Sequence, residues 1–346
     1  MSKNPLETIT LQTVADAAGV SVSTASRALA GKAKSYRISD KTEKLVREAA
    51  ERLGFRPSRV ARSLRSQRTG LIGVVVPDIS NPFFAAIAKE VTLEAEVDGY
   101  SVLLADSRES TETEQRLITE FLDRQIEALV VCPVGTESTH LAAADRSGIP
   151  VVLVDRTFPD ADMVQVTSDH IGGAKAAITL LLEQGHRNIG ILQGLPKTLP
   201  NQQRLDGVRS TLQSQQIPFD TTRVAGDNFT ETSGHQSAIE ILSRHPDTTA
   251  LFAFSTPNAM GALRAAAEVG LDVPRQLSIV AFDDAPFAEF LKVPLSTISQ
   301  DVRRLGTTAA KLVSNHLRTG KRPHQKLHHV DVAIIRRLSI HEAPTC

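Results

Sequence analysis

The stretch TLQTVADAAGVSVSTASRAL, residues 10–29, decides the fold of the amino-terminal part of the chain. Its first apolar residues recur at i, i+3, i+4 and i+7, which is the spacing of one face of a short helix. Thr10 can cap this helix, Gly19 can end it, and Ser21 can cap a second helix that runs to about Leu29. Two short helices joined by a glycine-containing turn form a helix-turn-helix.

The second helix is expected to carry short polar groups and one arginine on its outer face. Val22, Ser23, Thr24 and Arg27 would lie there, and such side chains suit the major groove of DNA. The alternative is an ordinary pair of packed helices that does not touch DNA. Charge favours the first interpretation. Residues 1–69 contain 14 Lys and Arg against 6 Asp and Glu, a balance of +8, whereas the rest of the chain contains 25 against 33, a balance of −8.

A third helix follows a polar, basic loop. Ser39 can cap it and Gly54 can end it, and its apolar stripe consists of Leu45, Val46, Ala49, Ala50 and Leu53. After it, arginine recurs every third residue from Arg56 to Arg68. This segment is either a flexible basic linker or a hinge that folds on DNA and inserts Leu64 into the minor groove.

From Leu71 the pattern changes to alternating apolar strands and helices. The strands are predicted at 71–76, 101–105, 128–132, 150–154, 188–192, near 223, 250–254 and 277–282, and the helices at 81–98, 112–124, 141–146, 170–184, 201–214, 231–244 and 257–269. This alternation predicts an α/β fold of two doubly wound parallel sheets with a cleft between two lobes. A helix at 301–318 and late strands within 326–335 would cross back between the lobes.

The chain therefore divides into a helix-turn-helix domain at 1–56, a hinge helix or linker at 57–69, and a two-lobed domain at 70–340. The first lobe is expected to comprise about 70–168 and 300–327, and the second about 169–299 and 328–340. With no apolar span long enough for a membrane and no signal-peptide core, we expect a cytoplasmic protein.

The sequence lacks the motifs of several common classes of functional site. Cys132 and Cys346 suggest neither a disulfide framework nor a metal site, and the adjacent His328 and His329 would face opposite sides of a strand. The motifs of nucleotide, serine hydrolase and zinc protease sites are missing from the sequence. We expect no catalytic residues, no metal and no cofactor.

Ligands of open α/β sheets bind at the carboxyl ends of the strands. Candidate residues follow these ends: Phe83, Phe84, Asp155, Lys197, Arg204, Ser255, Thr256 and Asp283. Carboxylates, hydroxyls and an arginine beside aromatic rings suit a sugar, which needs partners for its hydroxyls and flat surfaces for its C–H faces.

The sequence resembles the lactose/galactose repressor family of bacterial transcription factors over about residues 9–340. The resemblance rests on residues 10–29 and on RVARSLRSQRTGLIGVVVPDISNPFF, VVLVDR, GHRNIGIL, RLDG, AFDD and PLSTISQDVRRLG. It implies a three-helix headpiece, a hinge helix and a core like periplasmic sugar-binding proteins. It also implies a homodimer, with a tetramer left open, that binds a pseudo-palindromic operator and responds to a small sugar or sugar phosphate.

By position, the resemblance implies roles for individual residues. The DNA-binding residues would be Thr10, Ser21, Val22, Ser23, Thr24, Ser26 and Arg27 in the headpiece, and Ser58, Arg59, Ala61 and Leu64 in the hinge. The effector-binding residues would be Phe83, Phe84, Asp155, Lys197, Arg204, Ser255, Thr256, Asp283 and Gln300.

Two departures from the usual pattern resemble the fructose repressor and sucrose repressor branch. Ser255 and Thr256 stand where an Asn-Asp pair is common, and the loop GKAKSYRISDKT is longer than usual. The hypothesis is a repressor of carbohydrate genes with a fructose-type effector: fructose, a fructose phosphate or sucrose. The alternatives are a regulator of another sugar such as ribose or a glucoside, a sugar-binding module without DNA function, and a sugar-processing enzyme.

Overall fold

The computed structural model describes residues 9–55 and 68–344. Contacts divide the chain into two units, Met1–Thr69 and Gly70–Cys346, and each is described by itself. The predicted hinge helix, with Ser58, Arg59, Ala61 and Leu64, lies outside the described residues. None of the described helices is long and apolar enough to span a membrane.

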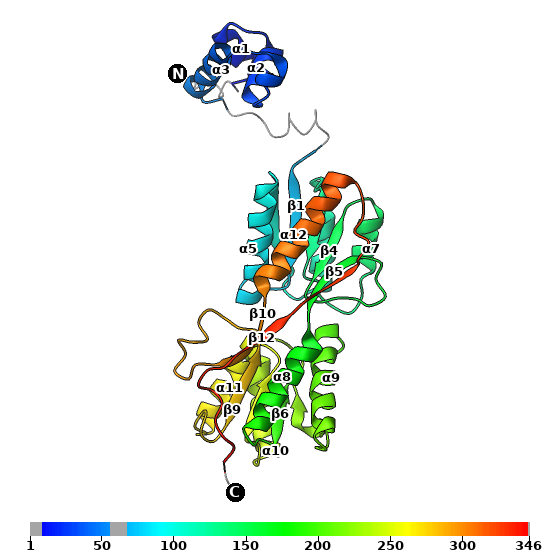
Figure 1. Ribbon diagram of the computed structural model, residues 1–346, viewed down its shortest axis with the longest axis vertical. Coiled ribbons are helices and arrows are strands. Elements are labelled where there is room, and N and C mark those ends of the chain that lie inside the picture. The colour runs from blue at the N-terminus through cyan, green and yellow to red at the C-terminus, as the bar shows by residue number, and fades with distance from the viewer. Residues whose placement is uncertain (1–8, 56–67, 345–346) are drawn as a thin grey trace, which may run out of the picture. The chain divides into compact units, whose positions relative to one another are not determined.

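In the first unit, residues 9–55 form a headpiece of three helices (Figure 1). These are α1 (Leu11–Ala18), α2 (Val22–Leu29) and α3 (Asp40–Leu53), with a short 3-10 turn, η1 (Lys34–Tyr36), in the loop before α3. The predicted caps are confirmed: Thr10, Ser21 and Ser39 each accept a hydrogen bond from a backbone N–H of the first turn, and Gly19 adopts the left-handed conformation that ends α1.

Small side chains from all three helices form the headpiece core. Val14, Ala25 and Val46 are fully buried, together with neighbouring alanines. Leu45 was expected in this core, but it is 45% exposed. Its place on α3 beside Val46 turns it outward, because adjacent helical residues point about 100° apart.

The second unit consists of two lobes, each built on a six-stranded sheet. We define the N-lobe by its sheet, which is parallel throughout. In sheet order its strands are β11 (Leu327–Val330), β5 (Val164–Ser168), β4 (Val151–Val154), β3 (Ala128–Val131), β1 (Leu71–Val76) and β2 (Ser101–Asp106). Its helices are α5 (Pro82–Val97), α6 (Thr111–Asp123), α7 (Thr139–Arg146) and α12 (Val302–Thr319).

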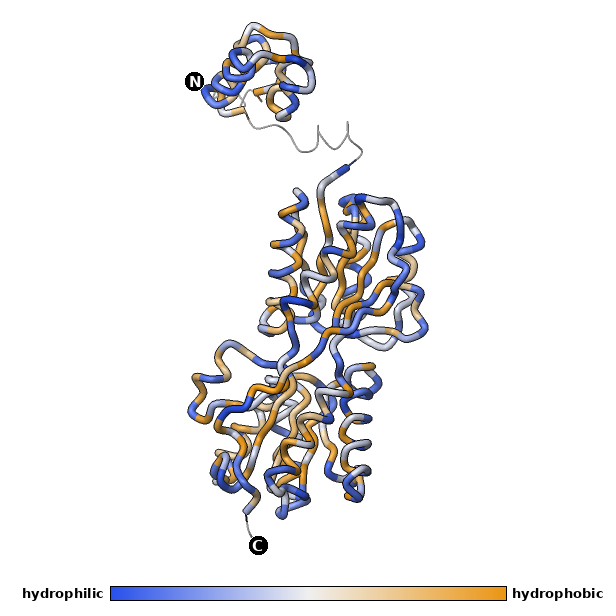
Figure 2. Tube along the Cα trace, in the orientation of Figure 1, coloured by the Kyte–Doolittle hydropathy of each residue, from blue (hydrophilic) through white to orange (hydrophobic). Residues whose placement is uncertain are grey.

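Helices cover both faces of the N-lobe sheet. Val74 and Val76 pack in the core beneath α5 and α12, whereas Val75 packs in the core beneath α6 and α7. Alternate residues of one strand thus serve opposite faces, which explains why these strands read as continuous apolar runs. Figure 2 shows hydrophobic residues concentrated along the strands inside each lobe. Cys132, at the end of β3, is a buried free thiol.

The C-lobe is built in the same way. In sheet order its strands are β12 (Val332–Ile335), β10 (Ser296–Gln300), β9 (Ser278–Phe282), β8 (Ala250–Ala253), β6 (Ile189–Leu192) and β7 (Val224–Ala225), with β12 antiparallel to β10. Its helices are α8 (His170–Glu183), α9 (Leu199–Ser214), α10 (Glu231–Arg244) and α11 (Thr256–Glu268), and a 3-10 turn, η2 (Thr221–Arg223), precedes β7. The predicted fold class is confirmed.

The chain passes between the lobes three times. It crosses after Ser168, returns after Gln300 to form α12 and β11, and crosses again between Val330 and Val332. The sequence analysis placed this last crossing after residue 327, which is wrong. Residues 327–330 form β11, which pairs in register with β5 of the N-lobe.

Candidate functional site

The N-terminal end of α2 presents a cluster of hydroxyl groups. Ser21 Oγ accepts the Thr24 N–H at 3.2 Å and lies 2.9 Å from Ser23 Oγ and 2.8 Å from Thr24 Oγ1. Ser23 and Arg27 are exposed, whereas Val22 packs partly against the headpiece core. The exposed face of α2 therefore consists of short hydroxyls and one guanidinium.

Other predicted DNA-binding residues of the headpiece also make contacts within the headpiece. Thr10 forms a reciprocal capping box with Thr13, and Ser26 is half-buried. The guanidinium carbon of Arg27 lies 4.1 Å from the centre of the Tyr36 ring, which projects from the loop between α2 and α3. The DNA contacts of all these residues remain predictions.

In the second unit, a small polar chamber lies between the lobes. Its volume is about 20 Å³, which is room for about one water molecule. Both lobes supply its walls: Asn81, Phe83, Phe84, Asp155, Arg156, Pro200, Arg204, Phe229, Ser255, Asp283 and Gln300. All but one of the predicted effector-binding residues at strand ends thus approach this chamber or its neighbour, described below.

Arg204, on α9, is the central cation of the polar chamber. Its side chain is 3% exposed and packs over the Phe282 ring, whose centre lies 3.8 Å from Cζ. Its Nη1 donates to the carbonyl of Phe254, and its Nη2 lies 4.0 Å from Asp283 Oδ1. Burial lowers the pKa of Arg204, and the nearby carboxylates oppose that shift.

Asp155 follows β4 with a positive φ of 68°, which directs its buried side chain into the chamber. Burial raises the pKa of Asp155 to about 6; Arg204 lowers it and Asp283 adds to the rise. His170 lies beside it, with Nε2 4.0 Å from Asp155 Oδ1 and Nδ1 3.3 Å from Arg204 Nη2. Burial holds the pKa of His170 well below its usual value, so its ring is neutral and Nδ1 accepts from Arg204.

Asp283 and Asp284 point to different partners. Gln300 Nε2 donates to Asp283 Oδ1, and burial raises the pKa of Asp283. Asp284 instead binds the guanidinium of Arg337, with contacts of 2.8 and 3.1 Å, and accepts from Thr297 Oγ1. The two carboxylates therefore do not act together as a catalytic acid and base, because Asp284 is held by Arg337 and only Asp283 faces the polar chamber.

Three buried polar atoms of the chamber residues have no hydrogen-bond partner among residues 9–55 and 68–344. They are Asp155 Oδ1, Arg204 Nε and Gln300 Oε1. Leaving buried polar groups unpaired costs about 1–3 kcal/mol each, so their gathering at one place needs a reason. Two acceptors and one donor beside Phe83 and Phe84 match the hydroxyls and C–H faces of a sugar.

Arg156 supports the wall of the chamber. It forms a bidentate pair with Glu109, at 2.6 and 2.7 Å, and its Cζ lies 5.5 Å from the centre of the Phe229 ring. The bidentate pairing and the ring contact hold the buried guanidinium in place.

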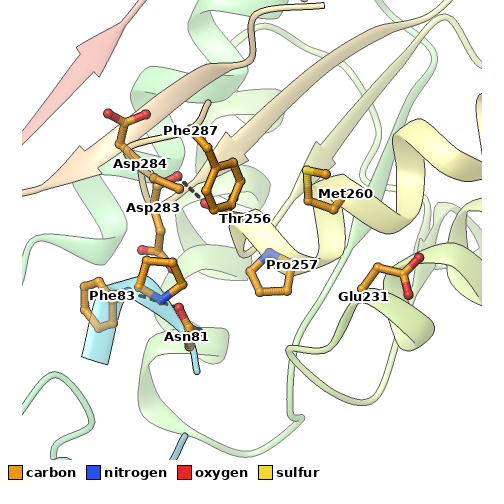
Figure 3. Close-up of a pocket in the computed structure, with 11 residues that line it drawn as sticks. Asn81, Phe83, Glu231, Thr256, Pro257, Met260, Asp283, Asp284 and Phe287 are labelled. Carbon is orange, nitrogen blue, oxygen red and sulfur yellow. Dashed lines mark hydrogen bonds between the residues drawn. The ribbon is translucent and has the colours of Figure 1, made fainter. Parts of the chain in front are cut away.

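A larger chamber of about 320 Å³ adjoins the polar chamber (Figure 3). It is lined by Asn81, Pro82, Phe83, Glu231, Thr256, Pro257, Met260, Asp283, Asp284, Ala285 and Phe287. Thr256, a predicted effector residue, lines this chamber and donates from Oγ1 to the Asp283 carbonyl at 2.7 Å.

Lys197 does not line either chamber. Lys197 is exposed on the turn before α9, whereas Arg204 is buried within α9 itself. The sequence analysis placed both cations among the effector-binding residues, but the structure does not bring them to one cavity. Lys197 has a left-handed backbone, with φ of 71°, on the turn that precedes α9.

Sequence reasoning missed His170 and Phe229. His170 begins α8 directly after the first crossing, and Phe229 lies on an irregular connection between β7 and α10. Neither stands at the end of a recognisable apolar strand, so the strand-end rule could not find them. No group of three or more His, Cys, Asp or Glu residues in 9–55 and 68–344 is placed to hold a metal ion.

Two family descriptions match the chain. "Bacterial regulatory proteins, lacI family" matches residues 10–58, which include the helix-turn-helix, and "Periplasmic binding protein-like domain" matches residues 178–340. The first covers the predicted DNA-binding residues of α2, and the second covers most of the C-lobe and the last crossings between the lobes.

Similar proteins span nearly the whole chain. The HTH-type transcriptional regulator DegA of Bacillus subtilis is 30% identical over 322 residues, covering 92% of this chain and 94% of that protein. The ribose operon repressor of Halalkalibacterium halodurans is 32% identical over 304 residues, covering 88% of this chain and 89% of that protein.

Solved structures agree with this result. The lac repressor dimer bound to operator and the anti-inducer ONPF superposes with a TM-score of 0.85 at 26% identity, covering 97% of this chain and 100% of that one. A complex of the regulator CelR with cellobiose gives a TM-score of 0.73 at 28% identity, covering 96% and 99%. The relatives match nearly the full length of the chain, including its helix-turn-helix headpiece and its two-lobed core. The chain therefore belongs to the lacI family of bacterial regulatory proteins and is a transcriptional regulator rather than an enzyme.

Proposed function

We propose that this regulator represses carbohydrate genes by binding a pseudo-palindromic operator as a homodimer, and that a small sugar bound between the lobes controls its affinity for DNA. One observation carries the sugar assignment. The unpaired atoms Asp155 Oδ1, Arg204 Nε and Gln300 Oε1 belong to residues that line one chamber between the lobes. A polyhydroxyl ligand offers both the donors and the acceptors that these atoms need.

The exposed groups of α2 support the DNA assignment. Ser23 and Arg27 can reach base edges, and the N-terminal hydroxyls of Thr10 and Ser21 can face phosphates. The net charge of +8 over residues 1–69 supplies the electrostatic attraction. We also propose that residues 57–69 form the hinge, with Ser58, Arg59, Ala61 and Leu64 at the minor groove.

Coupling between sugar and DNA follows from the two-lobed construction of the polar chamber. Asp155 comes from the N-lobe, whereas Arg204 and Asp283 come from the C-lobe. With a volume of about 20 Å³, the chamber has room only for sugar hydroxyls, which would contact both of these walls at once. A sugar therefore favours the arrangement of the lobes in which both walls reach its hydroxyls, and the affinity for operator changes by linkage.

The class of sugar is left wider than the fructose-type hypothesis of the sequence analysis. The similar proteins named above include a ribose operon repressor and a cellobiose complex, and neither supports a fructose preference. A fructose-type effector stays a hypothesis to be tested beside other sugars. Because its target is chromosomal DNA, we propose that the protein acts in the cytoplasm.

Binding to promoter fragments at several salt concentrations tests the DNA function. Affinity for the preferred site should fall steeply between 50 and 200 mM salt, by about a thousandfold or more if several phosphates are contacted. A control fragment of scrambled sequence should bind weakly throughout. Weak, salt-independent binding without any preferred sequence would contradict the proposal, and so would operator affinity that no sugar changes.

A further inference from the structure

The polar chamber and the larger chamber are parts of one continuous site. Asn81, Phe83 and Asp283 line both of them. A cavity of about 150 Å³ holds one six-membered ring such as benzene, and ligand pockets usually measure about 300–1,000 Å³. The larger chamber, at about 320 Å³, therefore has room for roughly two rings, whereas the polar chamber has room only for protruding hydroxyls.

The walls of the larger chamber are mostly apolar. In Figure 3, Phe287, Pro257 and Met260 form one side of the space, and Asn81 and Phe83 of the N-lobe lie across from Thr256 and Pro257 of α11. Flat apolar side chains of this kind pack against the C–H faces of sugar rings. A ring in this chamber would be held by surface contact, and the ring nearest Asp283 would make the hydrogen bonds.

Charge in the larger chamber disfavours an anionic ligand. Its lining contains the carboxylates Glu231, Asp283 and Asp284, and among the described residues no lysine or arginine lines it. Of the two arginines of the polar chamber, Arg156 binds Glu109, and Arg204 binds the Phe254 carbonyl beside Asp283 and leaves only Nε without a hydrogen bond. A phosphate in the larger chamber would therefore meet acceptors rather than cations.

From this geometry we propose that the effector is a neutral two-ring sugar, a disaccharide or a glycoside of that size. Its first ring lies against Asp283 with hydroxyls directed to Asp155, Arg204 and Gln300, and its second ring lies against Pro257, Met260 and Phe287. This inference rests on the proposed sugar-responsive function, and it names the ligand class of the same site.

Calorimetry on the full-length protein tests the size and charge of the effector. The probes are fructose, glucose, galactose, fructose 1-phosphate, and the neutral disaccharides sucrose, maltose, lactose and cellobiose. At least one disaccharide should bind ten times more tightly, or better, than either of its component monosaccharides and than fructose 1-phosphate. A monosaccharide or sugar phosphate that binds as tightly as every disaccharide overturns the inference but leaves the proposed function standing. If none of the probes binds, the sugar-responsive function itself fails.

A cavity-filling variant tests the position of the second ring. Met260 is half-buried, so M260W can fill the larger chamber without disturbing the polar one. The affinity for the best disaccharide should fall at least tenfold, so that its advantage over its monosaccharide disappears. V269W is the matched control, because Val269 is exposed at the other end of α11, and it should leave all affinities within twofold.

Operator binding in the absence of sugar reports whether each variant is folded. If M260W does not fold, M260F fills the chamber less and takes its place. A folded variant of either kind that keeps the full advantage of the disaccharide overturns the inference.

Discussion

The guanidinium of Arg27 stacks on the ring of Tyr36, with Cζ 4.1 Å from the ring centre. Arg27 lies on the exposed face of α2, and Tyr36 belongs to η1 in the long loop that follows. The half-exposed ring thus limits the directions in which the guanidinium can point. The loop that departs from the usual family length therefore contacts the side chain that we expect to contact a base.

We predict that R27A weakens binding to the preferred operator by about 1–3 kcal/mol and relaxes sequence preference, because a base contact specifies while a phosphate contact does not. Y36A should cause a smaller loss on the same operator, since it frees the guanidinium without removing it. Fluorescence anisotropy with cognate and scrambled DNA measures both effects. Y36F, which keeps the ring, is the control and should bind as the parent does. Equal losses on cognate and scrambled DNA would show that Arg27 contacts only phosphates.

Sugar binding should weaken as the pH falls through about 6, the pKa to which burial raises Asp155. The raised pKa means that the unliganded protein gains stability from protonated Asp155 and loses it as the pH rises through about 6. A sugar hydroxyl, in contrast, donates to the carboxylate, so below this pH binding must first remove a proton. Affinity should fall by up to about tenfold per pH unit below 6.

Calorimetry at pH 5, 6 and 7.5 checks this dependence. D155N should bind more weakly at pH 7.5 and show a shallower pH profile, with the remainder due to Asp283, whose pKa is also raised. Affinity that is constant or higher at pH 5 would exclude a hydrogen bond from the sugar to the Asp155 carboxylate.

Replacing Asp283 should abolish the response to sugar and leave the headpiece competent. D283N keeps the size of the side chain but removes the charged acceptor, so sugar affinity should fall about 10–150-fold, as expected for a hydrogen bond to a charged group. Operator affinity without sugar should stay within twofold. D272N, at an exposed carboxylate that pairs with Arg275 far from the chamber, is the matched control. Normal release of operator by D283N would remove Asp283 from the effector site.

A substitution that disturbs the packing of α9 against α8 should weaken sugar binding indirectly. Gly207 is where α9 approaches α8 closely: a Cβ there would lie 2.6 Å from the Ile171 carbonyl oxygen and 2.7 Å from Ala174 Cβ. G207A must push the helices apart, which should cost about 1–3 kcal/mol of stability. Because Arg204 precedes Gly207 on the same helix, sugar affinity should fall as well. Thermal unfolding and calorimetry measure the two effects, and Q213A, at an exposed position of α9, should change neither.

Much of the fold could be predicted because helix caps and apolar runs depend on interactions between residues that are close in sequence. Thr10, Ser21 and Ser39 are caps whose partners lie three residues away, and continuous apolar runs such as 71–76 are strands buried on both faces. The strand-end rule likewise brought Asp155, Arg204 and Asp283 to one chamber, because the carboxyl ends of parallel strands meet at the cleft.

Where tertiary context decided, sequence reasoning failed. The strands β5 (VQVTS) and β10 (STISQ) carry polar residues that are buried only through partners elsewhere in the fold, so they resembled loops. The strand β11 was predicted from the sequence, but its pairing with β5, which moves the last crossing to residues 330–332, depends on tertiary context. Lys197 could not be placed because a single left-handed residue sets the direction of its turn.

The three crossings between the lobes have a consequence for synthesis on the ribosome. The N-lobe lacks α12 and β11, and the C-lobe lacks β12, until residues beyond 300 have left the exit tunnel. The headpiece, in contrast, is built from one continuous segment within residues 9–55, so it can fold while the rest is still being translated. Each nascent chain therefore acquires its DNA-binding part well before the part that regulates it, because the two lobes are complete only after residues 302–335 have been made.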